Sequence, residues 1–195
     1  MDYPLEMRFK IIAIAPQISV VDAKGGSICY VQQKLFKFKE AVNVFSDATK
    51  KQKLCEIKAD RMIDFSASYH FFDASGECFG GVRRKGLKSL WSAHYDVVDH
   101  QNQPIGTISE ENPMAKVFDS IFSEVPLIGN LSGFLFNPRY VLKNVGGQDT
   151  LRMKKQPAFW EGKFILEKLG GIDPVNELCC IMAFLMMTLL ERSRG

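Results

Sequence analysis

The sequence predicts a mainly β protein of the α+β class: a closed antiparallel β-barrel wrapped around a buried, apolar C-terminal helix. Three observations predict it. Short strand-like segments alternate with turn residues, an aspartate recurs at nearly constant spacing at these turns, and a long apolar segment with helix-favouring composition comes last. The 195 residues are 46% hydrophobic and 24% charged, which is typical of one soluble domain, expected to span residues 1–195.

The first expected element is an opening strand at residues 9–14 (FKIIAI). We expect no secretory signal, because the longest apolar run here is residues 11–15 and Asp2 and Glu6 precede it. The five cysteines show no CxxC pair and no zinc-ligand spacing. We therefore expect free, mostly buried thiols in a cytoplasmic protein.

Four β-hairpins are expected next, within residues 18–109. Aspartates spaced 25, 26 and 26 residues apart follow apolar segments: Asp22, Asp47, Asp73 and Asp99. The third residue after each aspartate is Gly25, Lys50, Gly76 or Asn102. An aspartate can bond to its own backbone at a turn, and Gly or Asn tolerates a left-handed backbone. The repeated pattern therefore predicts four strand–turn–strand units in one continuous antiparallel sheet.

The pattern changes after the fourth hairpin. Residues 112–113 (NP) suit the start of a helix, and apolar residues follow at helical spacing, so a short amphipathic helix is expected at 113–122. An irregular apolar loop with a short strand at 134–136 is expected next. Strands then resume at 140–142, turn at Gly146-Gly147, return at 151–153 and finish at 163–166.

The C-terminal segment predicts a helix that is apolar on all sides. Residues 173–174 (DP) supply a cap and a first-turn proline, and the 13 residues 178–190 contain one polar member, Thr188. Leu, Met, Ala and Cys dominate this run, which favours helix, and Arg192 suits its end. Because a membrane span needs about 20 apolar residues, we expect the helix to fill the barrel. Insertion into a membrane, or a role at its surface, is the alternative.

Turn motifs and the terminal helix together resemble the Tubby C-terminal-like superfamily. The likeness rests on residues 20–25 (VVDAKG), 71–76 (FFDASG), 95–102 (YDVVDHQN) and 104–106 (PIG), and on the helix expected at 174–192. The nearest branch is the LURP-one-related proteins, with phospholipid scramblases as more distant kin. The resemblance spans nearly the whole chain and implies a barrel of about 12 strands around the helix.

The resemblance implies fold more specifically than activity. Tubby domains bind phosphoinositides on a basic surface, and scramblases move phospholipids with calcium. This chain lacks the acidic calcium-binding segment of the scramblases and their long proline-rich N-terminal extension. Calcium-driven scrambling is therefore not expected. Lipid binding must depend on the basic residues alone, because no local motif maps the Tubby lipid site onto this chain.

Basic residues form the candidate lipid-binding surface. The residues expected to contact anionic headgroups are Arg83, Arg84, Lys85, Lys88, Arg152, Lys154 and Lys155. A further cluster, Lys50-Lys51-Lys53, stands at a hairpin tip. In the sequence, Trp91 lies near Lys88 and Trp160 lies near Lys155. Cations beside aromatic side chains suit binding at the level of the lipid headgroups. The alternative is that the cations are solvated loop residues and that the tryptophans belong to ordinary packing.

Catalytic, metal-binding and cofactor-binding patterns are not found, so we expect no enzyme, no metal and no cofactor. The histidines His70, His94 and His100 lack metal-ligand spacing. No GxSxG nucleophile motif or phosphate-binding loop is present. The repeated aspartates are better explained as turn formers than as paired catalytic carboxylates. Cys179 and Cys180 fall inside the apolar helix, where thiols would be unreactive.

These observations leave three functional hypotheses. The first is a non-enzymatic module that binds anionic phospholipid or phosphoinositide headgroups, peripheral at a membrane surface. The second is a soluble scaffold that binds a protein partner without lipid preference. The third is a scramblase-like phospholipid-handling protein whose helix inserts. A net charge of only +3 speaks against nucleic acid as a partner.

Overall fold

The computed structural model describes residues 1–10, 17–32, 41–60, 67–85, 94–111, 138–156 and 161–192. The helix expected at 113–122 and the strand expected at 134–136 lie outside these residues, as do Lys88, Trp91 and Trp160.

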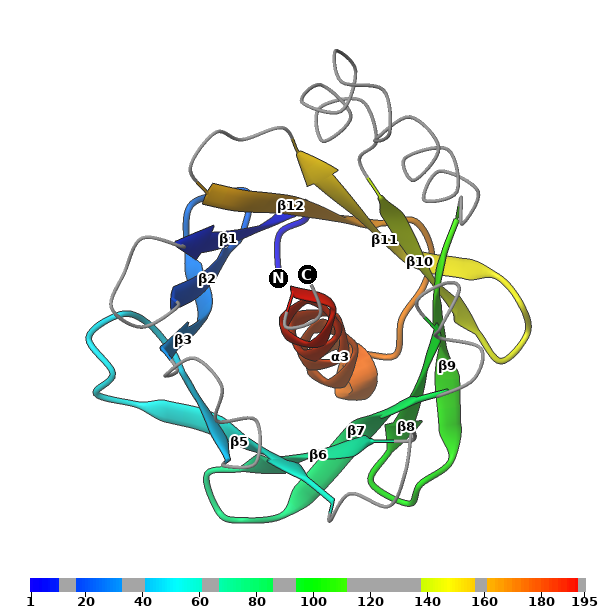
Figure 1. Cartoon of the computed structure of the whole chain (residues 1–195), viewed down its shortest axis with the longest axis horizontal. Coiled ribbons are helices and arrows are strands. Elements are labelled where there is room, and N and C mark those ends of the chain that lie inside the picture. Colours follow the sequence, from blue (N-terminus) through cyan, green and yellow to red (C-terminus); the bar gives the residue numbers. More distant parts are fainter. Residues whose placement is uncertain are drawn as a thin grey trace, which may run out of the picture.

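The described residues form a closed barrel of twelve antiparallel strands around one helix (Figure 1). Each strand pairs with its neighbours in the sequence, and β1 closes the barrel on β12, so the predicted fold class is confirmed. The strands are β1 Leu5–Lys10, β2 Gln17–Val21, β3 Ser27–Gln32, β4 Val42–Phe45, β5 Lys53–Ala59, β6 Ser68–Asp73, β7 Cys78–Arg84, β8 His94–Asp99, β9 Pro104–Glu110, β10 Arg139–Asn144, β11 Asp149–Gln156 and β12 Glu161–Lys168.

The opening strand starts earlier than expected. It begins at Leu5, not at Phe9, and its buried residues Leu5, Met7 and Phe9 alternate with the polar residues Glu6 and Arg8. The expectation followed the continuous apolar run at residues 11–15, whereas the period-2 alternation of a half-buried strand begins before it.

The hairpin turns have the geometry that the sequence predicts. At Asp73, the backbone N–H of Gly76 donates to the Asp73 carbonyl (3.1 Å), and Oδ1 of Asp73 accepts from the N–H groups of Ser75 and Glu77 (2.9 Å each). The third residue after every aspartate has a left-handed backbone, with φ of 82° at Gly25, 56° at Lys50, 88° at Gly76 and 68° at Asn102. The aspartate side chain thus accepts hydrogen bonds from backbone N–H groups of the turn. These bonds fix the position at which the chain reverses direction between the two strands.

A fifth turn of the same kind joins β10 to β11, with Asn144 in the place of the aspartate. Its Oδ1 accepts from the N–H of Gln148 (2.9 Å), and Gly147 takes the left-handed position with φ of 79°. The sequence predicts this turn from Gly146-Gly147, whereas Asn144 falls outside the repeated aspartate pattern. An amide oxygen accepts the same backbone hydrogen bonds as a carboxylate oxygen, so asparagine can form the same turn as aspartate.

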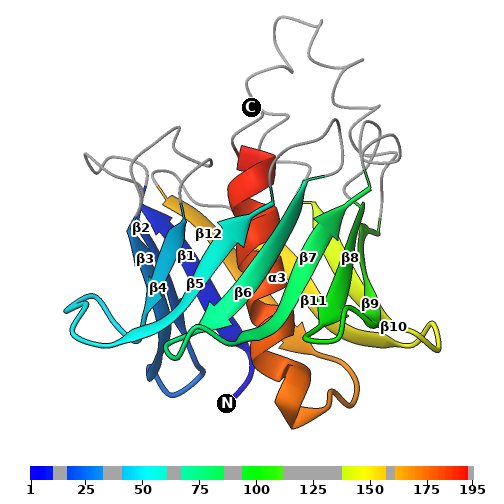
Figure 2. The same ribbon diagram turned by 90° about the horizontal axis from the view of Figure 1, so that it is seen from below.

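The C-terminal helix, α3 (Pro174–Arg192), runs through the lumen of the barrel, as predicted (Figures 1 and 2). Oδ1 of Asp173 accepts from the N–H of Val175 (3.0 Å) and so caps its start. Every residue from Cys179 to Leu190 is buried. Thr188, the polar residue in this run, donates its hydroxyl to the carbonyl of Phe184 (2.7 Å), so it is satisfied within the helix. No helix in the described part of the chain is long and apolar enough to cross a membrane.

The helix packs most closely against β7 and β8. Cys179 Sγ lies 3.4 Å from the carbonyl oxygen of Val98 on β8. On β7, a Cβ atom added to Gly80 would lie 2.4 Å from the same Sγ. Gly80 therefore makes room for the helix where the helix comes closest to the wall.

Candidate functional site

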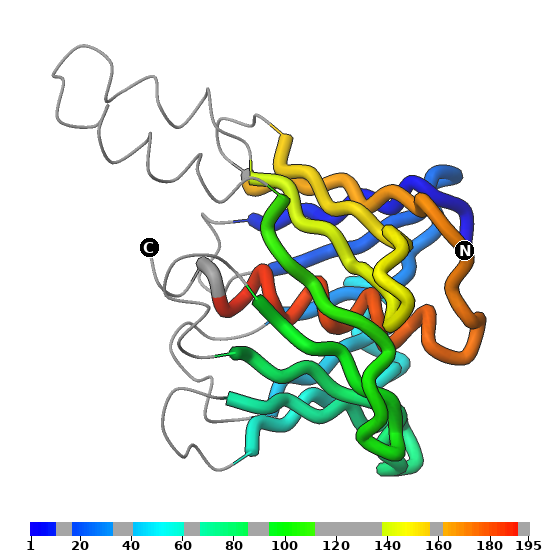
Figure 3. Tube along the Cα trace, turned by 90° about the vertical axis from the view of Figure 1, so that its right-hand side faces the viewer, coloured from blue at the N-terminus to red at the C-terminus, as the bar shows by residue number. Residues whose placement is uncertain are grey.

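The two ends of the barrel differ in chemistry. All five Asx turns lie at the end where α3 begins, which we call the turn rim (Figures 2 and 3). β7 and β11 both run toward the opposite end, where α3 ends. That end collects basic residues from strands far apart in the sequence. We call it the basic rim, and its members are Arg83, Arg84, Lys85, Arg139, Lys154 and Lys155.

The structure therefore places five of the seven predicted headgroup-binding residues at the same end of the barrel, in two groups that β8, β9 and β10 separate. Arg152 lies farther from this rim on β11, and Lys88 is outside the described residues. The cluster at Lys50 is at the turn rim, the other end of the molecule. Arg139, the first residue of β10, was missed because it stands alone in the sequence. Its register partner is Lys154, so the sheet joins it to the basic cluster.

Most of the cations that point outward have partners. Nζ of Lys85 lies 2.9 Å from Oδ2 of Asp96, and Nζ of Lys154 lies 2.8 Å from Oε2 of Glu167. Arg83 donates to the side-chain oxygen of Asn102 in the β8–β9 turn, so its guanidinium group extends from the basic rim toward the turn rim. Below the rim, Nε of Arg152 lies 2.7 Å from Oε1 of Glu111.

Ion pairs of this exposed kind contribute about 0–1 kcal/mol each, so they can open at little cost. Within the described part of the chain, Arg139 and Lys155 pair with no carboxylate. Among the described residues, the basic rim therefore contains cations without a carboxylate partner, together with cations that form weak ion pairs.

Strand alternation divides the basic residues between the two faces of the wall. Gly80 and Val82 on β7 face the helix, so Arg84 also faces the lumen, whereas Arg83 and Lys85 face outward. Lys155 pairs in register with the buried Phe164, which places it on the lumen side as well. The predicted patch is therefore an outer surface with two inward-facing cations, not one continuous face.

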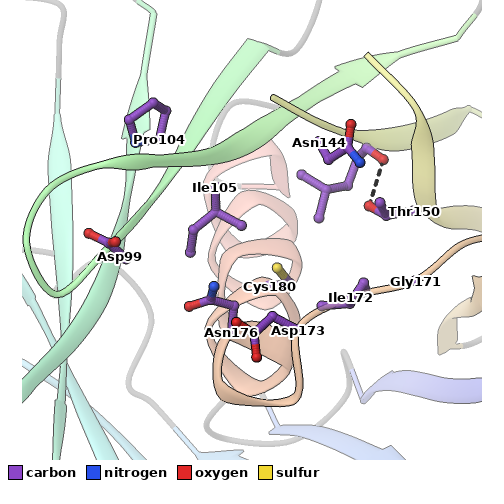
Figure 4. A pocket seen from close by; sticks show the side chains of 11 residues that line it. Asp99, Pro104, Ile105, Asn144, Thr150, Gly171, Ile172, Asp173, Asn176 and Cys180 are labelled. Atoms are coloured by element: carbon purple, nitrogen blue, oxygen red, sulfur yellow. Dashed lines mark hydrogen bonds between the residues drawn. The ribbon is translucent and has the colours of Figure 1, made fainter. Parts of the chain in front are cut away.

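A separate cavity of about 320 Å3 opens at the turn rim, between the β8–β9 and β10–β11 hairpins and the start of α3 (Figure 4). Its polar lining residues are Asp99, Asn144, Thr150, Asp173 and Asn176. Four of them already serve the fold: Asp99 and Asn144 form turns, Asp173 caps α3, and the hydroxyl of Thr150 donates to the Leu142 carbonyl (2.9 Å). The fifth, Asn176, carries an amide, which is neither an acid–base group nor a nucleophile, so the cavity has shape but no evident catalytic group.

The barrel interior holds thiols that are poor nucleophiles. All five cysteines are free, and Cys29, Cys55, Cys179 and Cys180 are buried. Burial raises the pKa of the Cys55 and Cys180 thiols to about 12 and that of Cys179 still further. Because the thiolate is the reactive form, these side chains act as core residues, as the sequence indicated. No three His, Cys, Asp or Glu side chains of the described residues gather as metal ligands.

A comparison with protein families adds one match. The model of a family described as LURP-one-related matches residues 27–130, just over half of the chain. This segment contains three of the four predicted aspartate turns and the basic residues 83–85. The family lies within the Tubby C-terminal-like superfamily, whose barrel is generally non-enzymatic. No curated protein matches the chain.

Proposed function

We propose that this chain, which belongs to the LURP-one-related family of the Tubby C-terminal-like superfamily, is a non-enzymatic module that docks on anionic phospholipid surfaces. The observation that carries the proposal is the basic rim. Arg83 on β7, Lys85 directly after it and Lys154 near the end of β11 lie at the same end of the barrel, with β8, β9 and β10 between the two strands.

Charge magnitudes support docking by this rim. A cation close to an anionic membrane surface contributes about 1 kcal/mol. An exposed ion pair such as Lys85–Asp96 contributes about 0–1 kcal/mol, so exchanging the carboxylate for lipid phosphate is neutral or favourable. The turn rim carries Lys50, Lys51 and Lys53 together with the carboxylates of Asp22, Asp47, Asp73, Asp99 and Asp173. Because these carboxylates repel an anionic surface, we orient the protein with the basic rim, where α3 ends, toward the membrane.

The test is sedimentation of the purified full chain with liposomes. One set contains phosphatidylcholine alone and another adds phosphatidylserine or a phosphoinositide, each at low and at physiological salt. We expect the protein to pellet only with the anionic liposomes and less at physiological salt, because counter-ions screen exposed charges. The triple variant Arg83→Gln, Lys85→Gln and Lys154→Gln should bind more weakly by up to about 100-fold, since it loses at most about 3 kcal/mol of attraction to the surface.

The matched control removes the same charge from the turn rim, with Lys50→Gln, Lys51→Gln and Lys53→Gln. It should bind the liposomes nearly as well as the wild type. If both triple variants lose binding equally, net charge and not the basic rim drives association. If no liposome pellets the protein under any condition, the lipid proposal fails and a soluble partner-binding scaffold becomes the better hypothesis. Pelleting that resists high salt would instead favour insertion of α3.

A further inference from the structure

Arg84 is the one basic-rim residue of β7 that faces the barrel lumen. It follows the buried Gly80 and Val82 at period 2 and pairs in register with Tyr95, which is fully buried. Its neighbours Arg83 and Lys85 point outward and bond to Asn102 and Asp96. Three consecutive cations therefore divide into two that serve the surface and one that enters the interior.

The guanidinium group of Arg84 presents one complete donor edge that is unused. Both Nε and Nη2 are buried from solvent, and neither has a hydrogen-bond partner. These two nitrogens lie on the same side of the planar group, so their N–H bonds are parallel. A parallel pair of N–H donors matches the two oxygens of a phosphate or carboxylate group. Leaving such an edge buried and unpaired is costly, which is unusual unless a ligand completes it.

No described side chain supplies the missing acceptor. Glu110 on β9 also faces the lumen and is 7% exposed, but it does not bond to the Nε–Nη2 edge of Arg84 and it has interactions of its own. Tyr69 on β6 lies close enough for the charge of Arg84 to oppose the burial that raises the tyrosine pKa. A phenol carries no charge at neutral pH and cannot balance a guanidinium. The counter-ion must therefore come from outside the described residues.

We propose that Arg84 is the receptor for a phosphate monoester group that enters the lumen at the basic rim. Phosphate fits better than carboxylate because its second negative charge is attracted by Lys155, which also faces the lumen at this end of the barrel. This inference deepens the proposed function: the outer cations attract an anionic surface, and Arg84 recognises one headgroup. It rests on that function only for the source of the phosphate.

The first experiment measures binding of soluble phosphates to the full chain by calorimetry. Inositol 1,4,5-trisphosphate and inorganic phosphate are the probes. We expect the trisphosphate to bind the wild type, and Arg84→Gln to weaken it at least about tenfold, because charge-assisted bonds are lost. Arg84→Lys should weaken it nearly as much, since an ammonium group cannot form the two parallel bonds. The matched control Lys51→Gln removes an exposed cation of the turn rim and should change affinity less than about threefold.

The second experiment separates binding from a structural role by using Arg84→Met. Without ligand, this variant should melt at a higher temperature than the wild type, because it removes a buried, unpaired charge. The trisphosphate should raise the melting temperature of the wild type but not that of the variant. A lower melting temperature of the ligand-free variant, together with no ligand-induced shift in the wild type, would overturn the proposal and assign Arg84 to the fold.

The source of the phosphate is tested with liposomes that contain phosphatidylinositol 4,5-bisphosphate. If Arg84→Gln loses binding to these liposomes and to the soluble trisphosphate, the ligand is a lipid headgroup. If soluble binding depends on Arg84 while no liposome pellets the protein, the membrane proposal fails and the Arg84 site stands as a receptor for soluble phosphates. If affinity for the trisphosphate is the same with Gln at position 84, the Arg84 proposal fails whatever the liposomes show.

Discussion

Replacing Gly80 by alanine tests the contact between the central helix and its wall. A Cβ atom at position 80 would lie 2.4 Å from Cys179 Sγ and 2.7 Å from the carbonyl oxygen of Val98. Ordinary contacts of this kind are about 3.5–4.0 Å, so the helix or the wall must move by about 1 Å. The backbone of Gly80 adds to the strain, because its φ of 154° is one that side-chain-bearing residues rarely adopt.

The magnitude follows from these two contributions. Overpacking a core costs about 1–3 kcal/mol, and an unfavourable backbone adds about 1 kcal/mol. We expect Gly80→Ala to lower the free energy of unfolding by about 3 kcal/mol. For a domain of this size, that corresponds to a fall in melting temperature of about 6–12 °C.

The assay is urea unfolding followed by circular dichroism, arranged as a double-mutant cycle. Cys179→Ala alone should cost about 1 kcal/mol, for the lost sulfur and the small cavity. In the double variant, the clash with Sγ is gone while the clash with Val98 remains. We therefore expect the two substitutions to be coupled by about 1–2 kcal/mol, in the direction of rescue.

The control is Gly171→Ala, since no atom lies within 4 Å of a Cβ at that exposed position. It should change stability by less than about 0.5 kcal/mol. If Gly80→Ala is equally silent, or if Cys179→Ala gives no rescue, then α3 does not lie against β7 as described and the reasoning is wrong.

Three further predictions concern the turns and the thiols. Lys50→Gly should stabilise the protein by about 0.5–1 kcal/mol in urea unfolding, because Lys50 has a left-handed φ of 56°, while Lys51→Gly should not stabilise it. Hydrogen bonds from Ser75 and Glu77 hold the pKa of Asp73 below its usual value. The wild type should therefore be more stable than Asp73→Asn at neutral pH. In thermal melts, this difference in stability should disappear as the pH falls below about 4, where the Asp73 carboxylate becomes protonated. A difference that persists at lower pH would contradict the role of these hydrogen bonds. An aromatic disulfide reagent should modify the native protein only at the partly exposed Cys78, so Cys78→Ser should abolish the native reaction; rapid labelling of that variant would show that the interior thiols are accessible.

Much of the fold could be predicted from local sequence patterns. The hairpins could be predicted from sequence because an aspartate turn is built by atoms within five residues of one another, as Asp73 and Glu77 show. The apolar helix could be predicted because its composition and its cap at Asp173 are local as well. The aspartate pattern does not reveal the role of Asn144, because the turn needs only a side-chain oxygen and an amide supplies one as well as a carboxylate does.

Candidate sites were less predictable because they depend on strand direction and on which face a residue occupies. Arg83, Arg84 and Lys85 look equivalent in sequence, but alternation sends Arg84 into the lumen. Arg139 is an isolated residue in the sequence that joins the basic rim only through its register with Lys154.

By itself, the sequence determined the repeated turns, the strands between them and the apolar helix that must be surrounded, because these depend on contacts between residues close together in the chain. Only the tertiary structure decided that β1 pairs with β12 and that α3 packs closely against Gly80. It also decided that cations of β7 and β11 lie at the same end of the barrel, with Arg84 facing the lumen. Those features depend on closure, register and strand direction, which join residues far apart in the chain and leave no local pattern.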